Sequence, residues 1–162
     1  MGPLISESQL NKVKYYTELG IKEGAKLVYG GHIIEEGVYS KGFFFEPTVF
    51  IDVTPNMRIA KEEIFGPVVC IMKAEDFDSA IDIANNTEFG LSSSIYTRDL
   101  KKSFRAIESL EVGVAYINSP PTGAEINGPF GGIKSSGNGE REQGTTAIDL
   151  FTEWKTVFIV TG

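Results

Sequence analysis

Apolar side chains recur with helical spacing close to the start of the chain. From Ser6 onward they follow one another at steps of three and four residues, as on the buried face of an amphipathic helix. Serine also favours the position just before a helix. The apolar positions are Leu10, Val13, Tyr16, Ile21 and Ala25. We therefore expect a helix that begins after Ser6, followed by a short strand, Lys26–Tyr29, that ends at Gly30 and Gly31.

The next two apolar segments have the pattern of strands. Residues 43–53 are rich in aromatic and β-branched residues and are interrupted by Pro47, which is typical of an edge strand. Residues 68–72 form a short, continuous apolar run. Such a run predicts a strand that is buried on both faces of a parallel sheet.

Helical and strand patterns alternate between residues 68 and 118. Asp76 and Asp99 each precede an amphipathic helix, and residues 91–96 and 112–117 are predicted as strands. The apolar faces expected of the two helices carry Phe77, Ala80, Ile81 and Ala84 in the first and Phe104, Ile107 and Leu110 in the second. This order predicts an α/β fold with a mostly parallel sheet and flanking crossover helices.

The character of the chain changes after Asn118. Residues 119–144 hold seven glycines and three of the seven prolines, which predicts a long loop, and long ordered loops are often functional. Residues 142–151 are expected to be helical. Residues 154–160, WKTVFIV, form a hydrophobic strand candidate that needs a pairing partner.

Charge and composition narrow the range of partners. The net charge of −7 argues against nucleic acid or an anionic membrane surface as the main partner. No apolar run is long enough to span a bilayer. A single cysteine, Cys70, excludes an internal disulfide and favours a reducing compartment, so we expect a cytoplasmic location.

The common catalytic patterns are weak in this sequence. Cys70 lies inside an apolar strand candidate, where a cysteine behaves as a small hydrophobe with a raised pKa. His32 is the only histidine, is expected in an exposed turn, and leaves no set of zinc ligands of the usual kind. In the glycine-rich residues 132–139, no Lys-Ser/Thr follows the second glycine, as a phosphate-binding loop requires. We therefore expect no metal site and no catalytic residue in this chain.

Two adjacent carboxylates, Glu62 and Glu63, precede Phe65 and a Gly-Pro turn within KEEIFGPVV, residues 61–69. They could form a polar helix terminus ahead of a buried strand. Alternatively, one carboxylate could accept hydrogen bonds from a sugar diol while Phe65 offers a flat apolar face. The residues alone do not choose between these interpretations.

Three separated motifs together resemble the NAD(P)-dependent aldehyde dehydrogenase superfamily. They are KEEIFGPVV, PFGGIKSSG at residues 129–137, and the closing REQG with FTEWKTV at residues 141–144 and 151–157. The resemblance covers essentially the whole chain and begins at GPLI, residues 2–5. It implies that residues 1–151 are the C-terminal portion of such a catalytic domain and that residues 152–162 are an oligomerisation strand.

The resemblance also implies roles for individual residues. Glu63 would bind the ribose of NAD or NADP, and Phe65 would pack near the nicotinamide. Asn118 and Phe130 would line the aldehyde site. Residues 120–126 and 137–139 are similar to members that act on semialdehydes.

The family's reaction is the oxidation of an aldehyde to a carboxylate. The catalytic cysteine, the glutamate base and the Rossmann-like domain of the family are expected upstream of this sequence. The chain alone is therefore predicted to be inactive.

A different class of function is also compatible with these residues. The chain could be an interaction subunit that pairs with a separate N-terminal half or assembles with copies of itself. Bare strand edges, including residues 154–160, favour such pairing. A homo-oligomer formed through the C-terminal strand is the partner arrangement that the resemblance implies.

Overall fold

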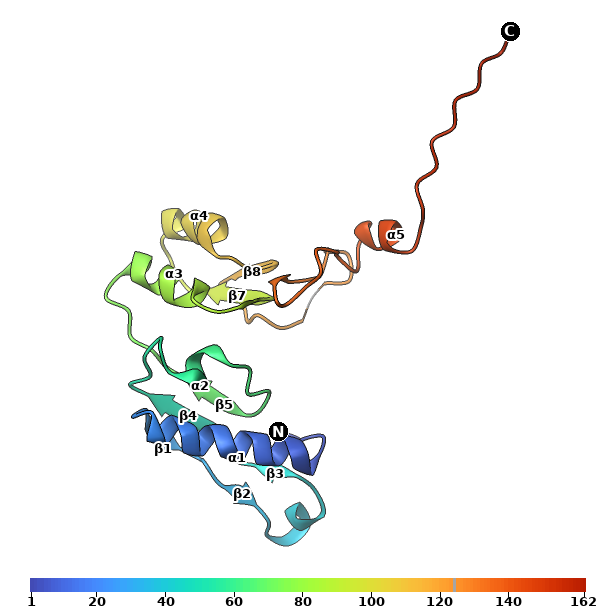
Figure 1. The fold of residues 1–162 in the computed structure, drawn as a ribbon. Coiled ribbons are helices and arrows are strands. Elements are labelled where there is room, and N and C mark those ends of the chain that lie inside the picture. Colours follow the sequence, from blue (N-terminus) through green and yellow to red (C-terminus); the bar gives the residue numbers. More distant parts are fainter. Residues whose placement is uncertain (124) are drawn as a thin grey trace. The chain divides into compact units, whose positions relative to one another are not determined.

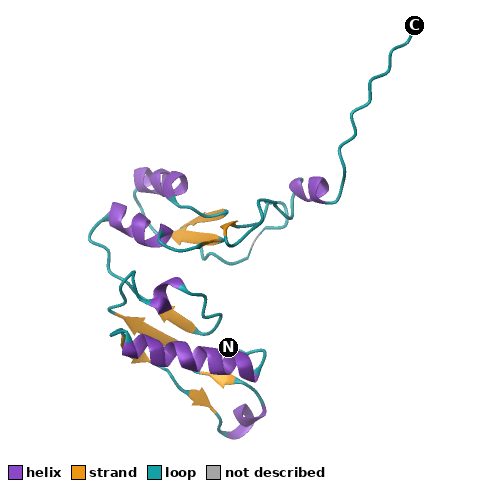
Figure 2. Cartoon of the chain, in the orientation of Figure 1, coloured by secondary structure: helices purple, strands orange, loops and turns teal. Residues whose placement is uncertain are grey.

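The computed structural model describes residues 1–123 and 125–162; residue 124, inside the predicted loop, lies outside the described residues. The chain divides into two compact units, Met1–Thr87 and Glu88–Gly162 (Figure 1). Both units combine helices with short strands (Figure 2), which confirms the expected α/β class. No helix within the described ranges combines the length and apolar character that crossing a bilayer requires.

The first unit is organised around helix α1, Glu7–Lys22. The helix begins as predicted, because the Ser6 hydroxyl accepts a hydrogen bond from the Gln9 amide at 3.2 Å. The buried stripe of this helix consists of Leu10, Val13, Tyr16, Thr17 and Gly20. The expectation for Ile21 was wrong, since 52% of its surface is exposed.

Strands β1 (Lys26–Tyr29), β4 (Thr48–Ile51) and β5 (Val68–Cys70) form a sheet in the order β1-β4-β5. β1 pairs antiparallel with β4, and β4 pairs parallel with β5. The central strand contributes Phe50, which is fully buried. The hydrophobic core of the unit consists of Leu10, Val13, Tyr16, Ala25, Phe45, Phe50, Val53, Ile59 and Ile64.

Strand β5 differs from its prediction. Val68 and Cys70 pack against the core, but Val69 and Ile71, which alternate with them, are 57% and 48% exposed. Successive side chains of a strand point to opposite faces, so only one face of β5 is buried in this chain. The expectation of burial on both faces was therefore wrong for the chain as described.

The first unit contains five smaller elements. β2 and β3 form an antiparallel pair, which encloses a 3₁₀ helix that the sequence pattern did not predict. α3 begins at Asp76 as predicted, with a capping box in which Asp76 and Ser79 exchange hydrogen bonds. The bounds are β2 Ile33–Ile34, 3₁₀ helix Gly37–Lys41, β3 Phe44–Phe45, α2 Arg58–Lys61 and α3 Phe77–Asn85.

In the second unit, β7 (Ser92–Ile95) pairs parallel with β8 (Val114–Ile117). They are joined by α4 (Leu100–Ser109), which begins at Asp99 as predicted. This crossover confirms one of the expected parallel units. β5 belongs instead to the sheet of β1 and β4, so the strands expected over residues 68–118 are divided between two sheets.

Helix α4 buries a different face from the one predicted. Phe104 and Ile107 are 58% and 51% exposed, whereas Ser103 and Ala106 are buried. The apolar stripe was identified correctly, but its hydrophobic side chains are not covered within the described residues. They line an open groove of about 500 Å³ together with Leu100 and Ile117.

The predicted glycine-rich loop contains one short strand. β9 (Ile133–Lys134) pairs antiparallel with β6 (Phe89–Gly90). The loop thereby returns to the start of the second unit, and Gly90 allows this approach, because an added Cβ would lie 2.8 Å from Ile133 Cγ1 of β9.

The C-terminal part is less regular than predicted. α5 spans only Thr146–Leu150, because Gln143 and Gly144 have φ angles of 65° and 56°, which a right-handed helix excludes. Residues 152–162 run as an extended chain after α5 (Figure 1) and form no strand with any described residue. Trp154 and Phe158 are each 89% exposed. The pairing of this segment with a partner stays a prediction.

Candidate cofactor loop

The segment Glu62–Gly66 connects α2 to β5 and is the most defined candidate site in the first unit. Glu62 is the C-terminal cap of α2, and Ile64 is buried in the core. Glu63, which lies between Glu62 and Ile64, is exposed, and Phe65, which follows Ile64, is 72% exposed. The backbone is thus fixed by Glu62 and Ile64, while two side chains point to solvent. We call residues 62–66 the cofactor loop below.

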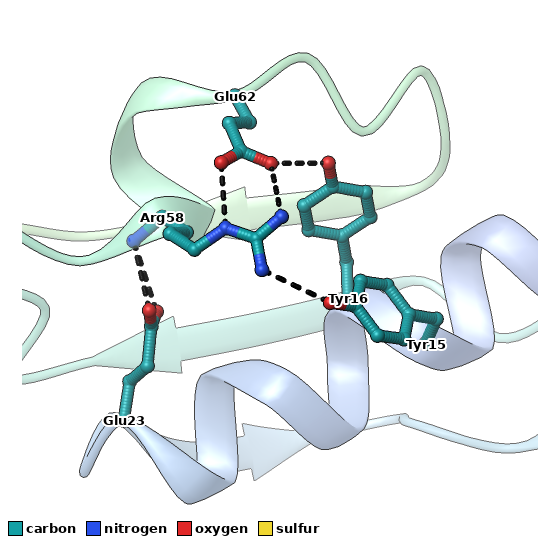
Figure 3. Close-up of polar contacts among 5 residues, drawn as sticks. All are labelled: Tyr15, Tyr16, Glu23, Arg58 and Glu62. Atoms are coloured by element: carbon teal, nitrogen blue, oxygen red, sulfur yellow. Dashed lines mark hydrogen bonds and ion pairs between the residues drawn. The ribbon is translucent and has the colours of Figure 1, made fainter.

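Glu62 is held by three hydrogen bonds from two side chains (Figure 3). The Arg58 guanidinium binds both carboxylate oxygens, with Nε–Oε1 and Nη2–Oε2 distances of 2.6 and 2.9 Å. The Tyr16 hydroxyl of α1 donates to Oε2 at 2.5 Å. Hydrogen bonds from Arg58, which has the larger effect, and from Tyr16 lower the pKa of Glu62 to about 2. The hydrogen bond between Tyr16 and Glu62 also raises the pKa of Tyr16. Glu62 is therefore a structural carboxylate.

Glu63 has the opposite environment, because its carboxylate is exposed. The sequence left two interpretations open for this pair of carboxylates. The structure assigns the polar helix terminus to Glu62 and leaves Glu63 accessible to a ligand. A carboxylate is an acceptor of up to four hydrogen bonds, which suits a vicinal diol.

Phe65 is presented to solvent by a strained backbone. Its φ angle is 54°, a conformation that costs a residue with a side chain about 1–3 kcal/mol. The Gln9 side-chain amide of α1 donates to the carbonyl oxygens of Ile64 and Phe65, both at 2.8 Å. Gly66 then packs so closely on α1 that an added Cβ would lie 2.3 Å from Val13 Cγ2. Contacts with α1 therefore hold the loop in this conformation.

The accessible groups of this loop fit one end of a nicotinamide dinucleotide. An exposed acceptor stands two residues from an exposed flat ring, and a ribose with its nicotinamide presents two donors beside an aromatic plane. The exposed acceptor of Glu63 and the exposed ring of Phe65 therefore suit the group that the resemblance implies.

Asn118 and Phe130 belong to the second unit and line different cavities. Asn118 directly follows β8, and its side-chain amide accepts a hydrogen bond from Thr97 N at 2.8 Å and donates one to Thr97 O at 2.9 Å. It borders the apolar groove beside α4. Phe130 is half-buried and lines a cavity of about 240 Å³ with Leu91 and Leu150. Among the pockets lined by described residues, Asn118 and Phe130 thus belong to two different ones.

The other candidate groups have structural roles. The Cys70 thiol is half-buried, donates to the Ile59 carbonyl at 3.5 Å, and has a pKa raised by burial, as predicted. His32 is exposed. In the glycine-rich loop, Arg141 donates to the carbonyls of Gly132 and Glu140 at 3.0 and 2.9 Å. The described residues contain no cluster of His, Cys, Asp and Glu that could hold a metal ion.

The sequence analysis missed the residues that hold the loop: Gln9, Tyr16 and Arg58. One signal was available, because Arg58 and Glu62 are four residues apart and can pair on a helix. Gln9 and Tyr16 carried no comparable signal. Their partners lie 46 to 56 residues away in the chain, so only the tertiary structure connects them.

The chain is similar in sequence to members of one known protein family. The model of the aldehyde dehydrogenase family matches residues 1–157. An alpha-ketoglutaric semialdehyde dehydrogenase of Bacillus subtilis is 43% identical, over 98% of this chain and 33% of that protein. An alpha-ketoglutarate semialdehyde dehydrogenase of Haloferax volcanii is 46% identical, also over 98% and 33%.

A solved structure of the same family is also similar to this chain. An aldehyde dehydrogenase from Mycobacterium tuberculosis, complexed with NAD⁺, is 42% identical and superposes with a TM-score of 0.92, over 100% of this chain and 32% of that one. The chain thus spans about a third of the length of the relatives that it matches. The expected partial domain is confirmed, and the chain belongs to the aldehyde dehydrogenase family.

Proposed function

We propose that this chain is the C-terminal part of an aldehyde dehydrogenase catalytic domain and supplies one wall of its NAD(P) site. The observation that carries the proposal is the unequal environment of two neighbouring carboxylates. Glu62 is held by Arg58 and Tyr16, whereas Glu63 is exposed beside the exposed ring of Phe65. A purely structural helix terminus would not need the second carboxylate or the strained aromatic residue.

In this proposal Glu63 accepts hydrogen bonds from the two hydroxyls of the nicotinamide ribose. The Phe65 ring covers one side of the nicotinamide and excludes water there. Bound NAD(P) would supply the acceptor for the electrons of aldehyde oxidation. The choice between NAD and NADP depends on contacts at the adenosine end of the cofactor, which the cofactor loop does not reach.

The single thiol of the sequence, Cys70, is not suited to attack an aldehyde. The Cys70 pKa is raised by burial, so little thiolate forms near neutral pH, and its S–H points to a backbone carbonyl. His32 is exposed in a turn and stands apart from Cys70 in the chain. The chain of 162 residues alone is therefore expected to be inactive.

We infer an aldehyde of the semialdehyde type for the whole enzyme, because relatives named for such substrates are similar to this chain.

Calorimetric titration with NAD⁺ tests the cofactor role. We expect weak binding, with Kd of about 1 mM or above, which corresponds to about 4 kcal/mol or less. Glu63→Gln keeps the shape of the side chain and removes its charge, and it should reduce the affinity. Equal affinity of the wild-type chain and Glu63→Gln would contradict the proposal.

An activity assay tests the absence of a reacting group. The purified chain is expected to form no NADH from aldehydes, including a short semialdehyde. Formation of NADH that disappears in Cys70→Ser would show that the chain contains its own nucleophile. That result would overturn the expected inactivity of the chain alone but not the proposed cofactor role of Glu63 and Phe65.

A second role is assembly, and it is favoured by the exposed apolar residues 152–162. Trp154, Phe158 and Val160 are between 89% and 94% exposed on an extended segment. We propose that this segment adds as a strand to another subunit of a homo-oligomer in the cytoplasm, or to a separate N-terminal half. Light scattering on the chain, with and without residues 152–162, tests this role. A monodisperse monomer at high concentration would contradict assembly of the chain with copies of itself.

A further inference from the structure

Two residues hold Glu62, the first residue of the cofactor loop and the neighbour of Glu63. They are Tyr16 of α1 and Arg58 of α2, whose side chains both bind the Glu62 carboxylate (Figure 3). The direction in which the chain leaves α2 is fixed by the position of Glu62. The Arg58–Glu62 contact is bidentate, and a planar guanidinium facing a carboxylate restricts orientation more than a single bond does.

Helix α2 is itself fixed on α1. A single turn of four residues is unstable in isolation because helix nucleation is costly. Here the Glu23 carboxylate, at the end of α1, accepts from the Arg58 amide at 3.1 and 3.0 Å. Ile59 is buried beneath the turn, against Gly20, where an added Cβ would lie 2.9 Å from Ile59 Cδ1. These contacts fix α2 on α1, and Glu62, at the end of α2, is thereby fixed relative to α1.

A second anchor lies on the same face of α1. Gln9 and Tyr16 are seven residues apart, which is two helical turns, so they project along one side. Tyr16 holds Glu62 at the start of the loop, and Gln9 holds the carbonyls of Ile64 and Phe65. Glu63 lies between these two anchors. The backbone around it is fixed although its own side chain is exposed.

We propose that Tyr16 and Arg58 are positioning residues for the nicotinamide-ribose end of the cofactor. They hold Glu62 and thereby keep Glu63 and Phe65 in the orientation that binds ribose and ring together. The inference rests on the proposed function of this loop and extends it to residues that need not touch the cofactor. A loop that is ordered before binding loses less conformational entropy when the ligand arrives.

The test uses the full chain labelled with ¹⁵N and two probes, nicotinamide mononucleotide and ribose 5-phosphate. Dissociation constants are taken from the amide shifts of residues 62–66, and amide hydrogen exchange of the same residues is measured without ligand. The variants are Tyr16→Phe, which removes one hydroxyl, and Arg58→Met with its conservative partner Arg58→Lys. Tyr29→Phe is the matched control, since Tyr29 lies on β1, is 64% exposed, and is outside the cluster.

We expect Tyr16→Phe and Arg58→Met to weaken nicotinamide mononucleotide binding by about tenfold, with partial recovery in Arg58→Lys. Ribose 5-phosphate should be affected less, because it lacks the ring that Phe65 covers. The ratio of the two affinities should therefore fall, which general destabilisation of the unit would not cause. Exchange at residues 64–66 should become about tenfold faster while exchange at Val13 and Phe50 stays unchanged.

The outcomes separate the two proposals. If Glu63→Gln weakens binding while Tyr16→Phe and Arg58→Met leave both the affinity ratio and the loop exchange unchanged, the positioning role is overturned and the proposed function stands. If nicotinamide mononucleotide moves no signal of residues 62–66 in the wild-type chain, the proposed function fails, and the positioning role fails with it.

Discussion

The two units of this chain differ in how much of their apolar surface they bury. The first unit holds nine of the ten buried hydrophobic side chains of the described residues, gathered around α1 and β4. The second unit contributes only Ala106 to that set, and its large apolar side chains on α4 and in residues 152–162 are exposed. A unit that buries so little apolar surface gains little hydrophobic stabilisation by itself.

This difference separates the two candidate sites. The cofactor loop is attached to the well-packed unit, where α1 fixes its backbone. The candidate aldehyde-site residues Asn118 and Phe130 belong to the unit with exposed apolar faces. Exposed patches of this kind commonly mark surfaces that other protein segments cover. We therefore expect the first unit to be ordered in the chain alone and the second to depend on further contacts.

The largest expected effect comes from the core of the first unit. Phe50→Ala removes a fully buried ring and should cost about 3–5 kcal/mol of unfolding free energy. Phe104→Ala is the matched change in the second unit and should cost less than about 1 kcal/mol, because Phe104 is 58% exposed. Urea unfolding, followed through NMR signals of each unit, measures both. Equal losses would contradict the contrast between the units.

A smaller effect is expected where the cofactor loop meets α1. Gly66→Ala places a methyl group 2.3 Å from Val13 Cγ2, and Val13 is fully buried and cannot move aside. The clash should cost about 1–3 kcal/mol and displace Phe65. Gly2→Ala is the control, because nothing lies within 4 Å of its added Cβ. Thermal unfolding of both variants is the measurement, and a Gly66→Ala variant as stable as Gly2→Ala would show that the loop is not packed as described.

Removal of residues 152–162 should have little effect on folding. The segment pairs with no described strand, so its loss should change the free energy of unfolding by less than about 0.5 kcal/mol. Its effect should appear in the mass of any assembly instead. Sedimentation or light scattering would show this, and a large loss of stability in the truncated chain would mean that the segment packs on its own subunit.

The smallest effect at neutral pH concerns the protonation of Glu62. Its pKa is lowered from 4.5 to about 2 in the folded chain, so its contribution to stability is fully present above pH 4.5. That contribution is lost as the pH falls toward 2. The Glu62 carboxyl carbon should therefore show no titration in NMR between pH 7 and 4.5. A midpoint near the ordinary value would mean that Arg58 and Tyr16 do not hold this carboxylate.

Much of the local structure followed from sequence. Ser6, Asp76 and Asp99 were correctly placed as helix starts, because short polar side chains at these positions satisfy free amide groups. The parallel pair β7 and β8 with its crossover helix also followed from the alternating pattern. Val69 and Phe104 were misplaced, since an apolar pattern shows which side chains would be buried but not whether a covering element is present.

The candidate site was predicted in part. Glu63 and Phe65 were singled out by resemblance, and their exposure agrees with a role in binding. The different environments of Glu62 and Glu63 could not be predicted, because both are glutamates. Glu62 is held by Tyr16, which lies 46 residues before it in the chain. The strain at Phe65 was equally hidden, since its φ angle depends on hydrogen bonds from Gln9.

A map of NAD⁺-induced amide shifts over the whole ¹⁵N-labelled chain tests directly whether the cofactor loop binds the cofactor. We expect shifts concentrated at residues 62–66 and on the face of α1 that holds them, and their loss in Glu63→Gln. Shifts concentrated instead in the glycine-rich residues 131–139, or no change at the cofactor loop at saturating NAD⁺, would contradict the claim that this loop is one wall of the cofactor site.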